Sequence, residues 1–352
     1  MPRKVARGAA GAVTLHDVAR RAGVSLATAS RALNGSKDRT VGQALQERVR
    51  AAAQELGYSA NPTAQAMARG RTDVVGLVVQ DIDDPYFSAI AAGVMREAQQ
   101  HDLLVTLAST QGRHGVEVDH VATLRGQWAR VVIVVGSRST DRAEQDRLAD
   151  ELAAFEASGG RAVAVSQPLL PIDTIELDNR GGAFELARGL HAQGYRRFAV
   201  LGGPPDLLTA IDRLAGFGEG LQRCGAPLRE GDVEPGEFTR DGGYAAMGRL
   251  LDRGTDASCV FAVNDVMAVG AMAALRERGV PLPEGMAVAG FDDIAMLRDV
   301  TPALTSVHVD LDGVGRAALR MALAAGDGRP RVESFGASVV VRASTPALAT
   351  LA

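Results

Sequence analysis

From residue 73 onward, the chain alternates short runs of apolar, mostly β-branched residues with longer segments of helical periodicity. Such runs predict buried strands, and their alternation with helices is typical of α/β folds with parallel sheets. The elements are too numerous for a single sheet of this kind, and a break near 165–178 predicts two lobes. The strand-like runs are VVGLVV (74–79), LLVTLA (103–108), VVIVVG (131–136), AVAVS (162–166), IEL (175–177), FAVLGG (198–203), CVFAV (259–263) and MAVAGF (286–291).

The first sixty residues follow a different, purely helical pattern. Thr14 and Asp17 form a capping signal for a helix that Gly23 can end, and Ser25 can cap a second helix through Leu33. Two short helices joined by a four-residue turn form a helix-turn-helix, and a third helical pattern follows over 43–57.

The second of these helices carries side chains that suit the major groove of DNA. Its inward positions are small or apolar, so that Leu26, Ala27, Ser30 and Arg31 face outward near its N-terminus. Arg31 can contact guanine through two hydrogen bonds, and Leu26 and Ala27 can touch thymine methyl groups.

The charge distribution supports a nucleic-acid partner for this head. The 352 residues carry a net charge of −4, but residues 1–72 hold 12 Lys+Arg against 4 Asp+Glu. The rest of the chain holds 26 basic and 38 acidic residues, so a basic head precedes an acidic body. This separation is typical of a DNA-binding protein with a distinct sensing or enzymatic part.

Other sequence features concern the compartment. No apolar run is long enough to span a membrane, and the basic N-terminus lacks the apolar core of a signal peptide. Cys224 and Cys259 have no metal or redox spacing, which fits a reducing environment. We therefore expect a cytoplasmic protein with no membrane partner.

A short segment, NPTAQAMARG (61–70), separates the head from the body. Asn61 and Pro62 can start a helix and Gly70 can end it, but a helix of about two turns is unstable alone in water. We expect it to order only when it is held by DNA and a second subunit. The predicted domains are thus a helix-turn-helix domain (1–60), a hinge (61–72) and a two-lobed α/β domain (73–352).

The sequence VTLHDVARRAGVSLATASRALNG (13–35) and the later ELGY closely resemble the signature of the LacI repressor family. The body is similar to the family's periplasmic-binding-protein-like, doubly wound core in RLAGF, NDVMAVGAM, VAGFDD and TPALTSV. The resemblance implies a dimer on a palindromic operator, with a hinge segment whose apolar wedge, here Met67, enters the minor groove. The DNA-contacting positions that it implies are Thr14, Ser25, Leu26, Ala27, Thr28, Ser30, Arg31, Asn34, Tyr58, Asn61, Ala64 and Met67.

The head departs from the family pattern where the third helix begins. Gly42, Leu45 and Gln46 stand where the family has residues that cap this helix and hold phosphates. We expect the phosphate contacts of this chain to be weaker or rearranged.

Candidate ligand-binding residues follow the predicted strands. Ligands of open α/β sheets lie beyond the carboxyl ends of the strands, where this chain places acids, amides, an arginine and aromatic residues. The resemblance matches Tyr86, Phe87, Arg213, Phe238 and Asp292 to effector contacts, and Asn264 to an amide contact; Asp178, which together with Asn179 follows IEL, completes the predicted set. Carboxylates, an amide and a planar guanidinium suit a sugar, which is favoured, or a purine.

Three classes of function remain to be compared. A ligand-responsive transcriptional regulator, most simply a repressor, fits both head and body. A solute-binding protein of a sugar transport system would share the body, but it has no use for the head and needs a signal peptide. An enzyme is not expected, because no nucleophile elbow is present and both lysines, Lys4 and Lys37, lie in the head. No cofactor or metal is expected, and the absence of heptad leucines in the tail predicts a homodimer rather than a tetramer.

Overall fold

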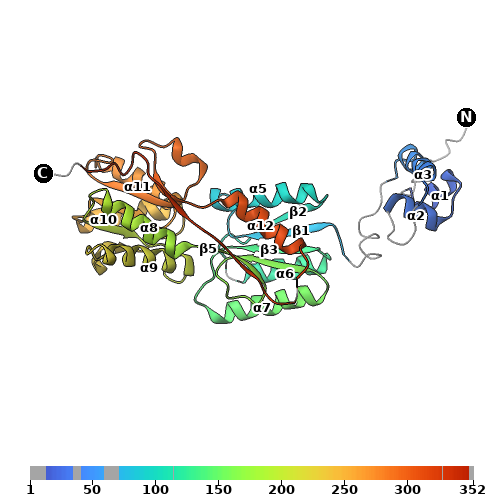
Figure 1. Cartoon of the computed structure of the whole chain (residues 1–352), viewed down its shortest axis with the longest axis horizontal. Helices are drawn as coiled ribbons and strands as arrows, with labels where there is room; N and C mark the ends of the chain where they lie inside the picture. Colours follow the sequence, from blue (N-terminus) through green and yellow to red (C-terminus); the bar gives the residue numbers. More distant parts are fainter. Residues whose placement is uncertain (1–12, 35–40, 59–70, 114, 327, 349–352) are drawn as a thin grey trace, which may run out of the picture. The chain divides into compact units, whose positions relative to one another are not determined.

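The computed structural model describes residues 13–34, 41–58, 71–113, 115–326 and 328–348 (Figure 1). The chain divides into two compact units, residues 1–72 and 73–352. Each unit has its own hydrophobic core, as the change of sequence pattern near residue 73 predicts.

The first unit contains three short helices around a small core. The capping signal at Thr14 starts the first helix, and Gly23 ends it with a φ of 64°, a left-handed conformation that suits glycine. Val18, Ala29 and Val49, one from each helix, are completely buried. The helices are α1 (Leu15–Ala22), α2 (Leu26–Asn34) and α3 (Gln43–Glu55).

The second unit has two lobes, each built on a six-stranded sheet with helices on both faces (Figure 1). In the first lobe the strand order is β11-β5-β4-β3-β1-β2, all parallel. Every residue of β3 is buried, which explains its continuous apolar run. The elements of this lobe are β1 (Val74–Val79), α5 (Pro85–Gln100), β2 (Leu104–Ser109), α6 (Val116–Gly126), β3 (Val131–Val135), α7 (Arg142–Ala157), β4 (Arg161–Val165), β5 (Asp173–Leu177), α12 (Leu311–Leu323) and β11 (Val332–Phe335).

The second lobe repeats this arrangement, with the strand order β12-β10-β9-β8-β6-β7. Only β12, which pairs with β10, is antiparallel to its neighbour. The elements are α8 (Asn179–Ala192), β6 (Phe198–Leu201), α9 (Leu208–Arg223), η1 (Glu230–Asp232), β7 (Val233–Glu234), α10 (Arg240–Arg253), β8 (Cys259–Ala262), α11 (Asp265–Glu277), β9 (Ala287–Asp292), η2 (Ala295–Arg298), β10 (Thr305–His308) and β12 (Ser338–Val340).

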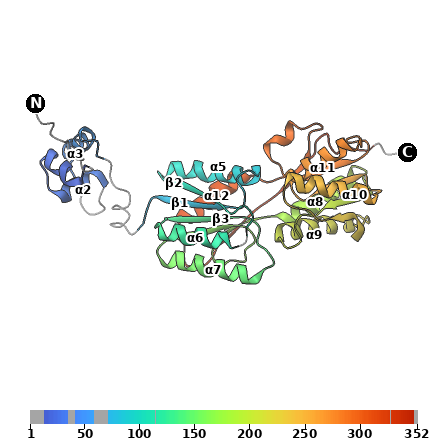
Figure 2. The same cartoon turned by 180° about the vertical axis from the view of Figure 1, so that it is seen from behind.

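The chain passes between the lobes three times: after β5, between β10 and α12, and between β11 and β12 (Figure 2). The two-lobed, doubly wound fold was predicted and is confirmed. The sequence, however, indicated only the first passage, near 165–178. The return of α12 and β11 to the first lobe was not predicted, because β11 (VESF) is short and is not an apolar run.

Close helix crossings hold each lobe together. In the first lobe, α5 crosses α12 at Gly93 and Gly315. A Cβ atom at Gly315 would lie 2.1 Å from the main-chain oxygen of Ile90, and one at Gly93 would lie 2.2 Å from that of Asp312. The two backbones therefore approach as closely as they do only because neither position has a side chain.

Candidate functional site

A cavity lies in the second unit where the carboxyl ends of strands from both lobes meet. In each sheet the order of the first strands reverses, between β1 and β3 in one lobe and between β6 and β8 in the other. Such switch points are where open α/β sheets bind ligands. The cavity has a volume of about 360 Å³, including the part open to solvent, and is lined by Gln80, Asp84, Tyr86, Phe87, Ser137, Thr209, Arg213, Phe238, Asn264 and Asp292.

Arg213 of α9 is the centre of the polar network in this cavity. Its side chain donates hydrogen bonds to Asn179 Oδ1 at 2.8 Å, to the Val263 carbonyl at 2.7 Å and to Asp292 Oδ1 at 2.7 Å. Its guanidinium carbon also lies 3.8 Å from the ring centroid of Phe291. These contacts fix the orientation of the guanidinium, and a group held in this way favours selective binding.

Asp292 is held in a conformation that is unusual for its residue type. It ends β9 with a φ of 110°, and its side chain is buried against Arg213. Burial raises the pKa of Asp292, while Arg213 lowers it. A non-glycine residue at such a φ is strained, and strain of this kind is concentrated at functional sites.

The N-terminus of α5 contributes a second carboxylate to the cavity. Asp84 caps this helix by accepting a hydrogen bond from the Tyr86 main-chain N–H at 2.9 Å. The pKa of Asp84 is raised to about 6, chiefly by burial and also by the nearby Asp292, against the opposing effects of that hydrogen bond and of Arg213. The cavity therefore holds two carboxylates and one guanidinium, which disfavours a negatively charged ligand.

Aromatic rings and one amide complete the walls. Tyr86 and Phe87 pack edge to face with their ring centroids 4.9 Å apart. Phe238 lies so close to Gly203 that a Cβ atom there would be 2.2 Å from the ring. Asn264 caps α11 through its Oδ1, which accepts from the Met267 N–H at 3.0 Å. Its amide NH₂ group has no hydrogen-bond partner among the described residues and is available to a ligand.

Six of the seven predicted effector residues lie around this cavity; the exception is Asp178. Its side chain is exposed and caps α8 by accepting from the Gly181 N–H at 2.9 Å. The next residue, Asn179, is buried and bonds to Arg213 instead. Gln80, Asp84, Ser137 and Thr209 also line the cavity but were not among the predicted contacts. Asp84 stands out in the sequence as an acid that follows a predicted strand, although it was not among the predicted contacts, whereas Ser137 and Thr209 give no distinctive sequence signal.

In the first unit, the predicted DNA-contacting residues of α2 lie on its outer side. Ser25 starts this helix, with its hydroxyl oxygen accepting from the Thr28 N–H at 3.1 Å. Leu26 and Ala27 are exposed, and Arg31 is half-buried with its Nε donating to the Ala27 carbonyl at 3.0 Å. The other face of the helix is buried in the core.

The other predicted DNA-contacting residues differ in their exposure to solvent. Thr14 is exposed and donates to Asp17, whereas Tyr58 and Ser30 are half-buried. Asn34 is the last residue of α2. The three predicted hinge contacts, Asn61, Ala64 and Met67, lie outside the described residues.

The departures at the start of α3 change how this helix is held. Gly42 occupies the cap position without a side chain, so only its carbonyl takes part, by accepting from Leu45 and Gln46. Gln46 donates from Nε2 to the Ala32 carbonyl at 3.4 Å, which links α3 to α2. In this structure Gln46 therefore positions the second helix.

Among the residues that the structure describes, no helix is both long enough and apolar enough to cross a membrane. Within the same ranges, no group of three or more His, Cys, Asp or Glu side chains could hold a metal ion.

Comparison with known proteins supports the assignment of both units. The profile of bacterial regulatory proteins of the lacI family matches residues 14–61, and that of a periplasmic binding protein-like domain matches residues 187–345. The transcriptional regulator CelR of Thermobifida fusca is 35% identical over 88% of this chain and 90% of its own length. The regulator GalR of Escherichia coli (strain K12) is 33% identical over 95% of this chain and 97% of its own length.

Solved structures agree with these sequence matches. The lac repressor dimer bound to operator and the anti-inducer ONPF aligns with a TM-score of 0.82 and 27% identity, covering 96% of this chain and 100% of that one. A complex of the regulator CelR with cellobiose aligns with a TM-score of 0.68 and 32% identity, covering 94% of this chain and 99% of that one.

Proposed function

This chain belongs to the LacI family of bacterial regulatory proteins, and we propose that it is a repressor whose affinity for its operator depends on a sugar-like effector. The observation that carries the proposal is the fixed Arg213–Asp292 network, which lies in an aromatic-lined cavity of a chain whose head is a helix-turn-helix. A transcriptional regulator needs both parts, whereas a solute-binding protein needs only the second.

The DNA-binding proposal rests on α2. Its exposed Leu26 and Ala27, with Arg31 one turn later, form the surface that a recognition helix presents to base edges. The lac repressor structure that this chain resembles is a dimer on its operator, and we extend that arrangement to this chain. We propose a homodimer on a palindrome, with residues 61–72 acting as the hinge and Arg31 contacting a guanine in each half-site.

The proposed effector is a neutral molecule rich in hydroxyl groups. The cavity combines aromatic faces with a fixed guanidinium, two carboxylates and an amide NH₂ group. These groups suit the hydroxyl groups and apolar face of a sugar ring, and the relative CelR has been solved with cellobiose. A phosphate or a carboxylate on the ligand would meet Asp84 and Asp292.

The effector would act by changing the relative orientation of the two lobes. It contacts Tyr86 and Ser137 from the first lobe and Arg213 and Asn264 from the second, so its binding favours one interlobe geometry. To change operator occupancy from nearly none to nearly complete, it must prefer one state by about 5.5 kcal/mol. Several charge-assisted hydrogen bonds can supply a difference of this size. We further propose that the protein acts in the cytoplasm and is not an enzyme.

The test is fluorescence anisotropy of the full-length protein on labelled palindromes from upstream of its own gene, at fixed salt. Neutral sugars, sugar phosphates and purines are added in turn. We expect tight, sequence-specific binding that a neutral sugar changes. A response only to a purine or a phosphate would refute the proposed effector class, and failure to bind any palindrome would refute the repressor itself.

A further inference from the structure

A second, polar cavity lies next to the one described above, within reach of the same ligand. It has a volume of about 640 Å³, part of it open to solvent, at the carboxyl ends of β1 and β3. Gln80 and Ser137 line both cavities. A ligand that extends past these two residues from the aromatic cavity would enter the polar one.

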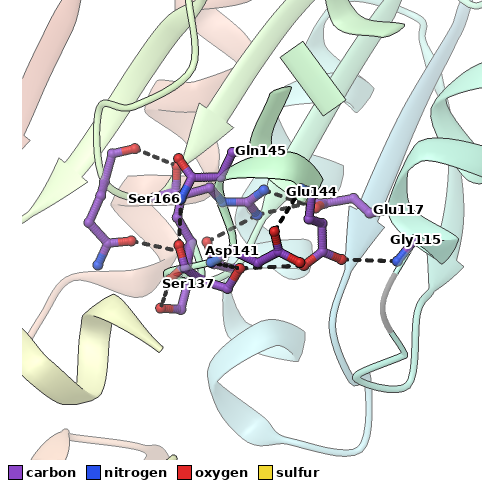
Figure 3. Close-up of polar contacts among 11 residues, drawn as sticks. Gly115, Glu117, Ser137, Asp141, Glu144, Gln145 and Ser166 are labelled. Atoms are coloured by element: carbon purple, nitrogen blue, oxygen red, sulfur yellow. Dashed lines mark hydrogen bonds and ion pairs between the residues drawn. The ribbon is translucent and has the colours of Figure 1, made fainter. Parts of the chain in front are cut away.

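The charged groups of the polar cavity are largely fixed and balanced (Figure 3). Arg138, which is only 5% exposed, donates two hydrogen bonds of 2.9 Å to the Glu117 carboxylate. Glu144 accepts from the Gly115 N–H at 2.9 Å. Together with Arg113 at the rim, these side chains give two positive and two negative charges. An added anion would therefore find no unbalanced cation.

Some hydrogen-bonding groups in its walls remain available. The side-chain amide of Gln80 has no hydrogen-bond partner within the described part of the chain. The Nε atom of Arg138 has none among the described residues either, but it is buried and out of reach of a ligand. The guanidinium of Arg113 is exposed and makes one hydrogen bond of 3.4 Å, from Nε to the Thr110 carbonyl. A neutral ligand with many hydroxyl groups can use such donors and acceptors.

We propose that this polar cavity is a second subsite, which binds the second ring of a disaccharide-sized, uncharged effector. The proposal rests on the proposed function, because it extends the same binding site. The aromatic cavity, at about 360 Å³, is smaller than the polar cavity, at about 640 Å³, so a ligand larger than one ring would extend past Gln80 and Ser137. None of the described residues that line the polar cavity is aromatic, so the second ring is held by hydrogen bonds rather than by stacking.

The second ring would lie next to a contact between the two lobes, because Arg138, Ser139 and Leu207, which form that contact, also line the polar cavity. Residues 137–140 of the first lobe run beside residues 206–209 of the second, with Leu208 N–H donating to the Arg138 carbonyl at 2.9 Å and Thr140 N–H donating to the Asp206 carbonyl at 2.8 Å. In addition, the Ser137 hydroxyl oxygen accepts from the Thr209 N–H at 2.9 Å. A monosaccharide in the aromatic cavity would contact Ser137 and Thr209 of this pair of segments, whereas a disaccharide would also reach Arg138, Ser139 and Leu207.

The test is isothermal titration calorimetry of the full-length protein with cellobiose, lactose and maltose, and with glucose, galactose and glucose 6-phosphate. Arg113→Ala removes a donor at the rim of the polar cavity only. Arg142→Ala, an exposed arginine outside both cavities, is the matched control. We expect one disaccharide to bind at least tenfold more tightly than its constituent monosaccharides. Arg113→Ala should lower the affinity for that disaccharide about tenfold and leave the affinity for the monosaccharide unchanged. Arg142→Ala should change neither affinity.

The possible failures are distinguishable. If a monosaccharide binds as tightly as every disaccharide that contains it, or if Arg113→Ala weakens both equally, the second subsite is wrong while the sugar effector stands. Tighter binding of glucose 6-phosphate than of the neutral sugars would overturn the proposal that the effector is uncharged. If no sugar of either size binds, the proposed effector class and the subsite both fail.

Discussion

The buried ion pair at the centre of the cavity gives a quantitative prediction for stability. Replacing Arg213 with methionine keeps much of the volume of the side chain but removes its charge. Three hydrogen bonds of 2.7–2.8 Å are lost, to Asn179, Val263 and Asp292. The Asp292 carboxylate, which is 4% exposed, loses its partner cation.

The expected cost is about 3–5 kcal/mol, the usual penalty for leaving one member of a buried pair uncompensated. It should also depend on pH. Burial raises the pKa of Asp292 and Arg213 lowers it, so without Arg213 the folded-state pKa rises further above the unfolded value. Stability is then lost as pH rises towards that pKa, because the folded state must give up a proton that it holds favourably. The Arg213→Met protein should therefore be more destabilised at pH 8 than at pH 5.

Urea unfolding of the full-length protein, followed by far-ultraviolet circular dichroism, measures this difference. The matched control is Arg180→Met, which breaks an ion pair with Glu219 between α8 and α9 whose side chains are 59% and 45% exposed. Exposed pairs contribute at most about 1 kcal/mol. Adding Asp292→Asn to Arg213→Met should recover part of the lost free energy of unfolding, because it removes the unpaired carboxylate. If Arg213→Met costs no more than Arg180→Met, the reasoning from burial is wrong.

Three other predictions concern the head, the cavity and the fold. Arg31→Ala should remove about 1–3 kcal/mol of the preference for guanine over other bases, measured by anisotropy titrations on operator variants. The control is Arg50→Ala, at an exposed residue of α3, which should weaken binding to all of these DNA sequences alike. In the wild type, sugar binding followed by calorimetry should weaken as pH falls from 7 to 5, because protonation of Asp84, whose pKa is about 6, removes an acceptor for ligand hydroxyl groups. Asp84→Asn should flatten that dependence, and an equal slope in both proteins would contradict the assignment. Gly315→Ala should cost about 1–3 kcal/mol in thermal unfolding, since its Cβ would lie 2.1 Å from a carbonyl oxygen of α5; Gly126→Ala, which meets nothing within 4 Å, should be neutral.

The features that the sequence predicted well are those set by local chemistry. The capping signal at Thr14, the left-handed Gly23 and the cap at Ser25 depend on neighbouring residues, and all three are found where they were expected. The eight apolar runs all contain strands. Most of these strands, such as β3, are buried on both faces and are therefore apolar throughout, whereas β2 at the edge of its sheet is partly exposed. The position of the cavity followed from the general rule for parallel sheets.

The features that were missed depend on contacts between distant parts of the chain. Asp178 and Asn179 are adjacent and both polar, and only the direction of α8 decides which of them reaches Arg213. Ser137 and Thr209 meet because two loops from different lobes run side by side. Neither pairing leaves a pattern in the local sequence, so no periodicity or spacing could have indicated it.

The path of the chain between the lobes also affects the order in which the protein can form during synthesis. The five parallel strands of the second lobe, from β6 to β10, are all present once residue 308 has emerged from the ribosome. The first lobe must wait for residue 335, because α12 covers α5 and β11 completes its sheet. The first lobe, although its strands β1 to β5 are translated first, therefore still lacks α12 and β11 when the five parallel strands of the second lobe have been made; β12 (Ser338–Val340) then completes the second sheet. Until α12 has been made, Ile90 and Val94 of α5, both fully buried in the finished protein, lack their α12 partner, and this face is the one that a nascent-chain chaperone would have to protect.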